Sequence, residues 1–239
     1  MDIRKKMLMT REELEKFGAI TIVIFGDSVS HGALLGEIDY ESVYWNLLRK
    51  RMNAARSYVP VNMICSAIGG TTSEQSLTRL ESQVLRYRPD MVIVCFGLND
   101  VNLELDTYLS SLEKIFVECL GIGAEVVFMT PNMLNTYLAD DTPVQHLEYA
   151  KKCANHQTSG RMDTYMQSAK ALAERMGVTV CDCYAEWKRL SETEDTTMML
   201  VNRINHPTRE MHKLFCDMLY DTIFKDTELA AQSDSTMFK

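Results

Sequence analysis

The chain has 239 residues, of which 46% are hydrophobic, and it carries a formal net charge of -8 at pH 7. This length predicts a single domain, residues 1–239, around one sizeable hydrophobic core. Nucleic acid is not expected as a partner, because the basic residues are interspersed with acidic ones, whereas phosphate backbones are bound through clustered Lys and Arg.

Five short apolar runs, rich in β-branched residues, are predicted to be strands. Their hydrophobicity is continuous rather than alternating, which is typical of strands buried on both faces of a parallel sheet. In chain order the runs are "AITIVIF" (19–25), "VPVNMIC" (59–65), "MVIVCF" (91–96), "AEVVFM" (124–129) and "GVTVCDC" (177–183).

The segments between these runs show helical periodicity. A helix with an apolar face between residues 77 and 85 is expected after "TTSEQ", and Asp106 is expected to cap the next helix. A long apolar stripe extends from Met162 to Met176, and Thr208 is expected to cap the last helix. This alternation predicts an α/β fold, a three-layer α/β/α sandwich with right-handed crossovers.

The segment 131–160 is long for a connection in a compact domain, and such segments are usually functional or mobile. We interpret it as a lid or as a wall of the substrate pocket. An ordered surface insertion without a role is the alternative.

The seven cysteines include no CxxC pair, and most lie inside apolar runs. Their placement and odd number predict buried free thiols in a reducing compartment. No apolar run approaches the ~20 residues that span a bilayer, and the N-terminus lacks the apolar region of a signal peptide. We therefore expect a cytoplasmic protein with no membrane span.

Four chemical signals follow strands or precede the last helix. Ser28 stands in "GDSVSHG" after the first strand, Gly70 in "SAIGGTTS" after the second and Asn99 in "FGLND" after the third, while His206 lies in "NRINHPT". Each alone has an ordinary structural explanation as a cap, a turn or a surface residue. Ligands of open parallel sheets bind beyond the carboxyl ends of the strands, where these signals would meet. Together they supply the nucleophile, donors and base that acyl transfer requires.

At these motifs the chain resembles a known family. The blocks "GDSVS", "IGGTTS", "GLND" and "NHP" are similar in order and spacing to those of the SGNH hydrolases, also called GDSL esterases and lipases. The resemblance implies a flavodoxin-like five-stranded parallel sheet, the SGNH hydrolase fold, and ester or thioester hydrolysis without a metal or other cofactor. It implies Ser28 as nucleophile, the N–H groups of Ser28 and Gly70 and the Asn99 side chain as oxyanion hole, and His206 as general base and then acid.

The family usually places an aspartate three residues before the histidine, and Arg203 stands there in this chain. Arginine accepts no hydrogen bond and would disfavour a cationic imidazole nearby. One interpretation is that another acceptor orients His206: Asp182 after the fifth strand, the side-chain carbonyl of Asn202 or Asn205, or a backbone carbonyl. Alternatively, Arg203 turns away from the ring and contacts an anionic part of the substrate, or catalysis has been lost and the pocket only binds.

We therefore expect a serine esterase acting through an acyl-enzyme on a small-molecule ester, with acetate on a carbohydrate as the first expectation. A lysophospholipase or thioesterase is the alternative within the family. A silent carbohydrate- or lipid-binding module is the rival from another class, and a flavin or nucleotide binder would leave Asn99 and His206 unexplained. His31, three residues after Ser28, is interpreted as a surface helical histidine. The sequence carries no signal for the oligomeric state.

Overall fold

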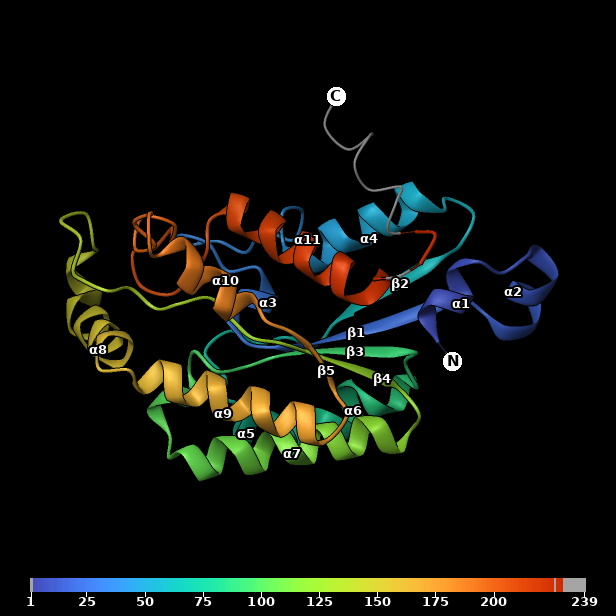
Figure 1. The fold of residues 1–239 in the computed structure, drawn as a ribbon, viewed down its shortest axis with the longest axis horizontal. Coiled ribbons are helices and arrows are strands. Elements are labelled where there is room, and N and C mark those ends of the chain that lie inside the picture. Colours follow the sequence, from blue (N-terminus) through green and yellow to red (C-terminus); the bar gives the residue numbers. More distant parts are fainter. Residues whose placement is uncertain (1, 226, 230–239) are drawn as a thin grey trace.

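The computed structural model describes residues 2–225 and 227–229, and a five-stranded parallel sheet lies at its centre (Figure 1). The strands are ordered β2-β1-β3-β4-β5, and each neighbouring pair is parallel. Each of the five predicted runs overlaps a strand, so the flavodoxin-like α/β prediction is confirmed. The strands are β1 (Ile20–Gly26), β2 (Val61–Cys65), β3 (Met91–Cys95), β4 (Glu125–Met129) and β5 (Thr179–Cys181).

The three central strands are buried as their apolar runs predict. Every residue of β3 is buried, and β1 and β4 are each buried at all positions but one. The edge strands β2 and β5 are partly exposed. Helices on both faces of the sheet exclude water from the central strands, which is why those strands need no polar face.

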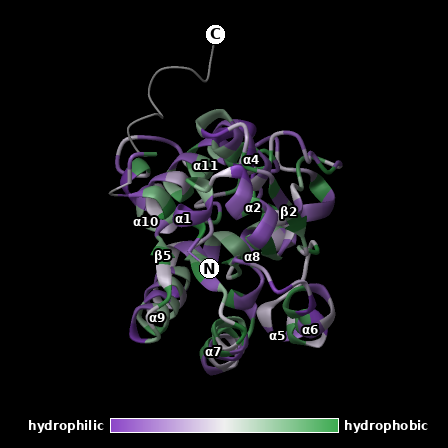
Figure 2. Cartoon of the chain, turned by 90° about the vertical axis from the view of Figure 1, so that its right-hand side faces the viewer, coloured by the Kyte–Doolittle hydropathy of each residue, from purple (hydrophilic) through white to green (hydrophobic). Residues whose placement is uncertain are grey.

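Two layers of helices cover the sheet (Figure 2). One layer contains α3 (Ser28–His31), α4 (Tyr44–Ala55), α10 (Cys183–Leu190) and α11 (Arg209–Phe224). The other contains α5 (Ser73–Ser76), α6 (Leu80–Gln83), α7 (Leu105–Gly121) and α9 (Arg161–Arg175). The short helices α1 (Ile3–Met7) and α2 (Arg11–Phe17) lie beyond the amino ends of the strands (Figure 1).

The helix predicted after "TTSEQ" is interrupted. A 3-10 turn, η1 (Leu77–Arg79), separates α5 from α6. Within this turn the Arg79 guanidinium is buried over the Phe25 ring and donates to the main-chain carbonyls of Gly26 and Ser66. The apolar periodicity does not predict this break. An arginine in the sequence indicates a position that faces solvent, whereas Arg79 is buried.

The other helix predictions are largely confirmed. The 162–176 stripe corresponds to α9, and Thr208 is the N-cap residue of α11, although its side chain makes no capping hydrogen bond. Asp106 was predicted as a cap, which is wrong, because α7 begins one residue earlier and Glu104 is its N-cap residue. The Asp106 carboxylate instead lies in the first turn, where it interacts favourably with the helix dipole.

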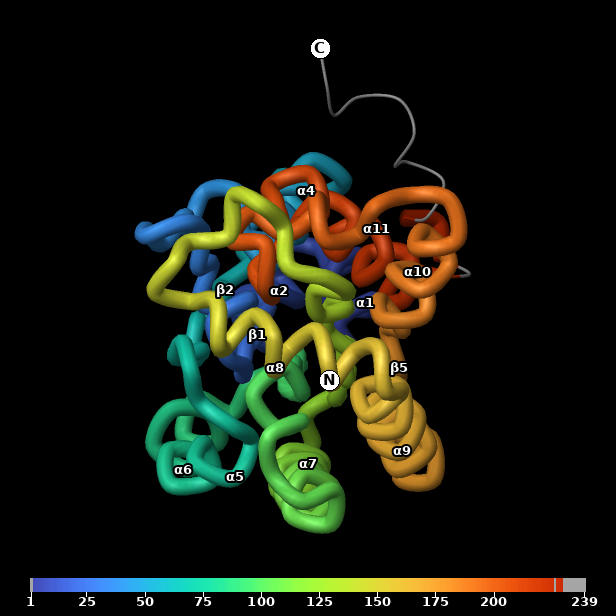
Figure 3. Tube along the Cα trace, turned by 90° about the vertical axis from the view of Figure 1, so that its left-hand side faces the viewer, coloured from blue at the N-terminus to red at the C-terminus, as the bar shows by residue number. Residues whose placement is uncertain are grey.

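The segment 131–160 is more regular than expected. It contains the 3-10 turn η4 (Val144–His146) and helix α8 (Leu147–Thr158). Figure 3 views the molecule from the carboxyl ends of the strands and shows α8 crossing in front of the sheet. The segment therefore lies at the end of the sheet where ligands of this fold class bind.

All seven cysteines carry free thiols; six are buried and Cys65 is half-buried, so the prediction of buried thiols is confirmed for six of them. No helix within residues 2–225 and 227–229 is long and apolar enough to cross a membrane. The same residues hold no group of three or more His, Cys, Asp or Glu side chains that could bind a metal ion.

His212 is a buried histidine that joins α11 to α4. Its ring stacks on Tyr44, with ring centroids 6.1 Å apart, and its Nδ1 accepts a hydrogen bond from the Tyr44 N–H at 3.4 Å. Nε2 is buried and has no partner among the described residues. Burial lowers the pKa of His212 to about 4.

The stability of the fold is expected to fall in acid because of His212. Between its ordinary pKa of 6.5 and about 4, the unfolded chain takes up a proton that the folded chain does not. The contribution of neutral His212 to the stability of the fold is therefore complete above the pKa of His212 in the unfolded chain, and it is lost as the pH falls below that value. Relative to His212→Phe, the wild type should lose roughly 2 kcal/mol of unfolding free energy between about pH 7.5 and about pH 5. Urea unfolding at both pH values measures this difference.

His146→Phe is the matched control, because His146 is exposed. Its stability should follow that of the wild type through the same pH range. Parallel pH curves for wild type and His212→Phe would contradict the assignment of acid sensitivity to His212.

Candidate active site

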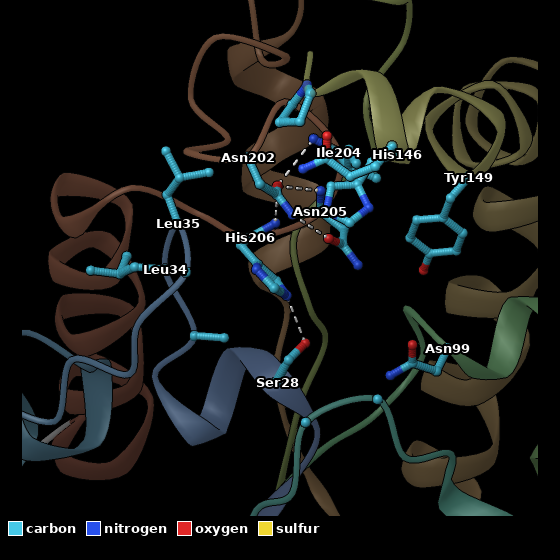
Figure 4. Close-up of a pocket in the computed structure, with 16 residues that line it drawn as sticks. Ser28, Leu34, Leu35, Asn99, His146, Tyr149, Asn202, Ile204, Asn205 and His206 are labelled. Carbon is cyan, nitrogen blue, oxygen red and sulfur yellow. Dashed lines mark hydrogen bonds between the residues drawn. The ribbon is translucent and has the colours of Figure 1, made fainter.

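The carboxyl ends of β1, β2 and β3 bring three loops together. Gly26 at the end of β1 pairs with Cys95 at the end of β3, and Ile24 of β1 pairs with Cys65 at the end of β2. The loops that follow these strands, together with the loop before α11, line one pocket of about 740 Å³. The predicted site residues that line it are Ser28, Gly70, Asn99, Asn202 and His206. Figure 4 shows the side chains of Ser28, Asn99, Asn202 and His206 around it.

Ser28 is the first residue of α3 and follows a tight turn. A Cβ atom on Gly26 would lie 2.4 Å from the Ser30 hydroxyl and 2.7 Å from a main-chain carbonyl oxygen of β3, so only glycine fits. The Asp27 carboxylate caps α3 by accepting a main-chain hydrogen bond. This turn places the Ser28 hydroxyl oxygen 3.0 Å from Nε2 of His206.

Asn202 holds the main chain of the loop that carries His206. Its side-chain oxygen accepts hydrogen bonds from the N–H groups of Ile204, Asn205 and His206, at 3.1, 3.0 and 2.9 Å (Figure 4). Its amide nitrogen donates to the Asn205 side-chain oxygen at 2.9 Å. The prediction that Asn202 or Asn205 accepts from the imidazole ring is therefore wrong, because both side-chain oxygens are used within the loop.

The His206 residue is half-buried, and its ring has no carboxylate partner among the described residues. Its Nδ1 makes no hydrogen bond of ordinary geometry among the described residues. Burial lowers the pKa of His206 below its ordinary value, and the main chain of Leu34 partly offsets this effect. A backbone carbonyl was one of the acceptors expected from the sequence, and no backbone carbonyl among the described residues makes a hydrogen bond of ordinary geometry with Nδ1.

Two groups besides Ser28 present donors to the same pocket. Gly70 has a φ of +77°, a left-handed conformation that favours glycine, and its N–H has no acceptor within residues 2–225 and 227–229. The Asn99 side-chain nitrogen donates to the Thr71 carbonyl at 3.1 Å and lies 3.4 Å from Oδ2 of Asp27. These contacts fix the Asn99 amide beside the loop that carries Gly70.

Two buried acids support this arrangement, and the sequence interpretation missed their part in it. Burial raises the pKa of Asp27 to about 7 and that of Asp100 to about 6, and the charge of Asp100 raises the Asp27 value further. Asp27 contacts Asn99, while Asp100 accepts hydrogen bonds from the N–H and hydroxyl of Ser73 at 2.8 and 2.5 Å. Their positions in the sequence could have indicated this part, since each acid is directly adjacent to a predicted site residue.

The match to a family model covers the whole of this site. The GDSL-like lipase/acylhydrolase family matches residues 24–214. The chain belongs to this family. It is therefore a carboxylic ester hydrolase, as the four sequence blocks indicated.

The fold is also similar to solved structures. An acetylxylan esterase from Geobacillus stearothermophilus matches with a TM-score of 0.70 and 19% identity, over 90% of this chain and 98% of that one. An α/β hydrolase enzyme from the metagenome of Lake Arreo, Spain, matches with a TM-score of 0.66 and 18% identity, over 87% of this chain and 97% of that one. At these identities the likeness shows the fold. A search of curated proteins found no match.

Asp182 does not orient the histidine of this GDSL-like hydrolase. Its carboxylate caps α10 through the Ala185 N–H and accepts hydrogen bonds from the Thr130 hydroxyl and the Lys170 ammonium. It does not line the pocket that contains His206. The prediction of an orienting role for Asp182 is wrong, because its oxygens are already used at the end of the edge strand.

Arg203 makes no contribution to the pocket. Its guanidinium pairs with Asp141 at 2.9 Å and donates to the main-chain carbonyls of Met198 and Leu200. Its φ of +60° directs the chain through the tight turn that ends at His206. Arg203 is not among the lining residues, and a contact with an anionic part of a substrate stays a prediction.

Two different walls flank the GDSL serine. Leu34 and Leu35 come from the loop after α3, and His146 and Tyr149 come from the segment 131–160 on the other side (Figure 4). The segment therefore forms part of the pocket wall, while a closing movement stays a prediction. None of the sixteen residues that line the pocket is Asp, Glu, Lys or Arg.

Proposed function

We propose that the protein is a serine esterase that removes a short acyl group, such as acetate, from a neutral carbohydrate. The observation that carries this proposal is the 3.0 Å contact between the Ser28 hydroxyl oxygen and Nε2 of His206 in an open pocket. This distance is within reach of direct proton transfer, which is the geometry that an activated serine requires.

Acylation begins when the Ser28 oxygen attacks the ester carbonyl carbon and its proton passes to Nε2 of His206. The N–H groups of Ser28 and Gly70 and the Asn99 side-chain amide stabilise the oxyanion. Collapse of this intermediate breaks the bond to the alcohol, which leaves with the proton from His206. Water then attacks the acyl-enzyme with the same base, and the acid and free Ser28 are released.

A Ser-His dyad performs these steps without a third side chain. The aspartate of a triad fixes the tautomer of the histidine and stabilises its cation. Here Asn202 fixes the loop of His206, and the main chain of Leu34 favours the cationic ring. Burial of the ring disfavours the cation, and the main chain of Leu34 offsets part of this effect.

The pocket lining favours a neutral substrate. A substrate with a buried charge would need an opposite charge or several donors, and no lining residue carries a formal charge at pH 7 if histidine is neutral. The amides of Gln145, Asn202 and Asn205 interrupt its apolar surface, which suits sugar hydroxyls better than a long acyl chain. The fold likeness to an acetylxylan esterase supports the same substrate class.

The substrate class is tested by comparing acetylated xylo-oligosaccharides and p-nitrophenyl acetate with acetyl-coenzyme A and a lysophospholipid. We expect kcat/KM to be at least ~10-fold higher for the neutral acetyl esters, equivalent to about 1.4 kcal/mol. Rates that favour either charged substrate would instead support the thioesterase or lysophospholipase alternative.

The reaction class is tested with a fluorophosphonate probe, followed by mass spectrometry of the peptide that contains Ser28. A covalent adduct on Ser28 and hydrolysis of any ester would support the proposed chemistry. A folded protein that neither reacts with the probe nor hydrolyses any of these esters would contradict it and would favour the binding module.

A further inference from the structure

His31 occupies a position that the sequence interpretation did not anticipate. It is the last residue of α3, three residues after Ser28, and it is half-buried rather than a free surface histidine. Its Nδ1 accepts a hydrogen bond from the Gly69 N–H at 3.3 Å, and its Nε2 lies 3.1 Å from the Tyr40 hydroxyl. Both ring nitrogens therefore have partners.

These contacts define the tautomer of His31. The Gly69 N–H is a donor, so Nδ1 must carry a lone pair, and in the neutral ring the proton is on Nε2. The Tyr40 hydroxyl is then the acceptor of that proton. Tyr40 also packs against the His31 ring, with ring centroids 6.0 Å apart, and it contacts the Trp45 ring. The ring is thus held on two sides in the orientation that receives the Gly69 hydrogen bond.

The loop that His31 contacts is held at its two ends, where the Ile68 N–H donates to the Gly26 carbonyl and the Asn99 amide donates to the Thr71 carbonyl. Between these ends, the Gly69 N–H donates to His31. Gly69 and Gly70 lack side chains, and the loop closes on itself through Thr71, whose N–H and hydroxyl donate to the Ile68 carbonyl at 3.4 and 2.8 Å. A Cβ atom on Gly69 would lie 3.6 Å from Cβ of Ser28, so the loop passes against the nucleophile itself. The His31 contact links this loop directly to the helix that begins with Ser28.

We propose that His31 is a positioning residue of the oxyanion hole, an inference that rests on the proposed function. It ties the Gly69–Gly70 loop to α3 and thereby fixes the Gly70 N–H relative to the N–H of Ser28. These are two of the three donors that face the developing oxyanion. His31 itself touches neither the substrate nor the reacting atoms, and it acts through the loop.

The experiment compares His31→Phe with His31→Asn. Phenylalanine keeps an aromatic ring but has no acceptor, whereas the asparagine side-chain oxygen occupies a position equivalent to Nδ1. For p-nitrophenyl acetate, His31→Phe is expected to lower kcat by about 10-fold with little change in KM, because the oxyanion forms only in the transition state. His31→Asn should recover most of the lost kcat.

Two further measurements separate positioning from a general structural role. The affinity for a boronic acid that forms a tetrahedral adduct on Ser28 should fall in proportion to kcat in His31→Phe and recover in His31→Asn. Hydrogen exchange of the Gly69 amide should accelerate in His31→Phe alone. His31→Leu serves in the same role if His31→Phe does not fold.

The outcomes distinguish this inference from the proposed function. An active wild type with an unchanged kcat in the variants that lack an acceptor overturns the positioning role alone. Equal losses in His31→Phe and His31→Asn, or a rise in KM without a fall in kcat, overturn it as well. A folded wild type that hydrolyses no ester overturns the proposed function, and the positioning role with it.

Discussion

Ser28→Ala, His206→Ala and the double variant are each expected to lower kcat by roughly 10⁴- to 10⁶-fold, with the double variant no slower than the slower single one. The reason is that the Ser28 hydroxyl and the His206 imidazole, 3.0 Å apart, act as one unit. Without the hydroxyl there is no nucleophile to activate, and without the imidazole the hydroxyl is not activated. Steady-state hydrolysis of p-nitrophenyl acetate measures kcat for all three variants. The residual rate should come from substrate binding and the oxyanion donors alone.

His156→Ala is the matched control for His206→Ala, because it removes a histidine that does not line the pocket. Its kcat should stay within about twofold of the wild type, as for surface changes away from functional groups. A loss of less than 10-fold in His206→Ala would show that another group acts as the base. Losses that multiply in the double variant would show that Ser28 and His206 act independently.

The pH profile of kcat/KM is a second test of whether His206 acts as the base for Ser28. Burial places the pKa of His206 below its ordinary value of 6.5, and only the neutral ring can accept the Ser28 proton. Activity should therefore rise with pH through an ionisation on the acid side of 6.5 and stay high above it. The residual activity of His206→Ala should lack this rise.

The arrangement of the sheet could be predicted from the sequence because burial on both faces leaves a simple signature. Residues 91–96 contain no polar side chain, and the strand found there is buried throughout. The parallel order then places the residues after each strand at one edge of the sheet. Ser28, Gly70 and Asn99 converge for this reason, although 71 residues separate the first from the last.

Side-chain direction could not be predicted in the same way. Asp182 follows a strand, as Ser28 and Asn99 do, but its carboxylate is used by the cap of α10 and by Lys170. Arg203 occupies the position where the family has an aspartate, yet its partner Asp141 lies 62 residues away in sequence. Spacing along the chain does not determine which of several nearby polar partners a side chain chooses.

A backbone carbonyl was among the acceptors expected for His206, but which residue lies beside the ring could not be predicted, for a different reason. Every residue has a main chain, so no sequence motif marks the main chain of Leu34 as the one that raises the pKa of His206. The same holds for His31, whose partner is the main-chain N–H of Gly69. Main-chain partners can be identified only from a three-dimensional structure, which shows where the loops that carry them lie.

Asn99→Ala is expected to lower kcat by about 10²- to 10³-fold, or ~2.7–4 kcal/mol of transition-state stabilisation, with KM nearly unchanged. One N–H of the side chain is held by the Thr71 carbonyl at 3.1 Å, and the other makes a longer contact, 3.4 Å, with Asp27. The Thr71 contact fixes the amide beside the site, and the second N–H must exchange its long contact with Asp27 for the oxyanion as it forms. Kinetics with p-nitrophenyl acetate, together with the affinity of the boronic acid, measure the loss.

Asn99→Asp provides the sharper comparison, because it keeps the shape of the side chain and removes the N–H donor. The new carboxylate would face both the oxyanion and Asp27, whose pKa burial already raises to about 7. Like charges at such short range disfavour each other, so kcat should fall further than in Asn99→Ala. Asn155→Ala, an exposed asparagine outside the pocket, should leave kcat unaltered. If Asn99→Ala instead raised KM at constant kcat, Asn99 would bind the ground state, and the oxyanion would depend on the main-chain donors.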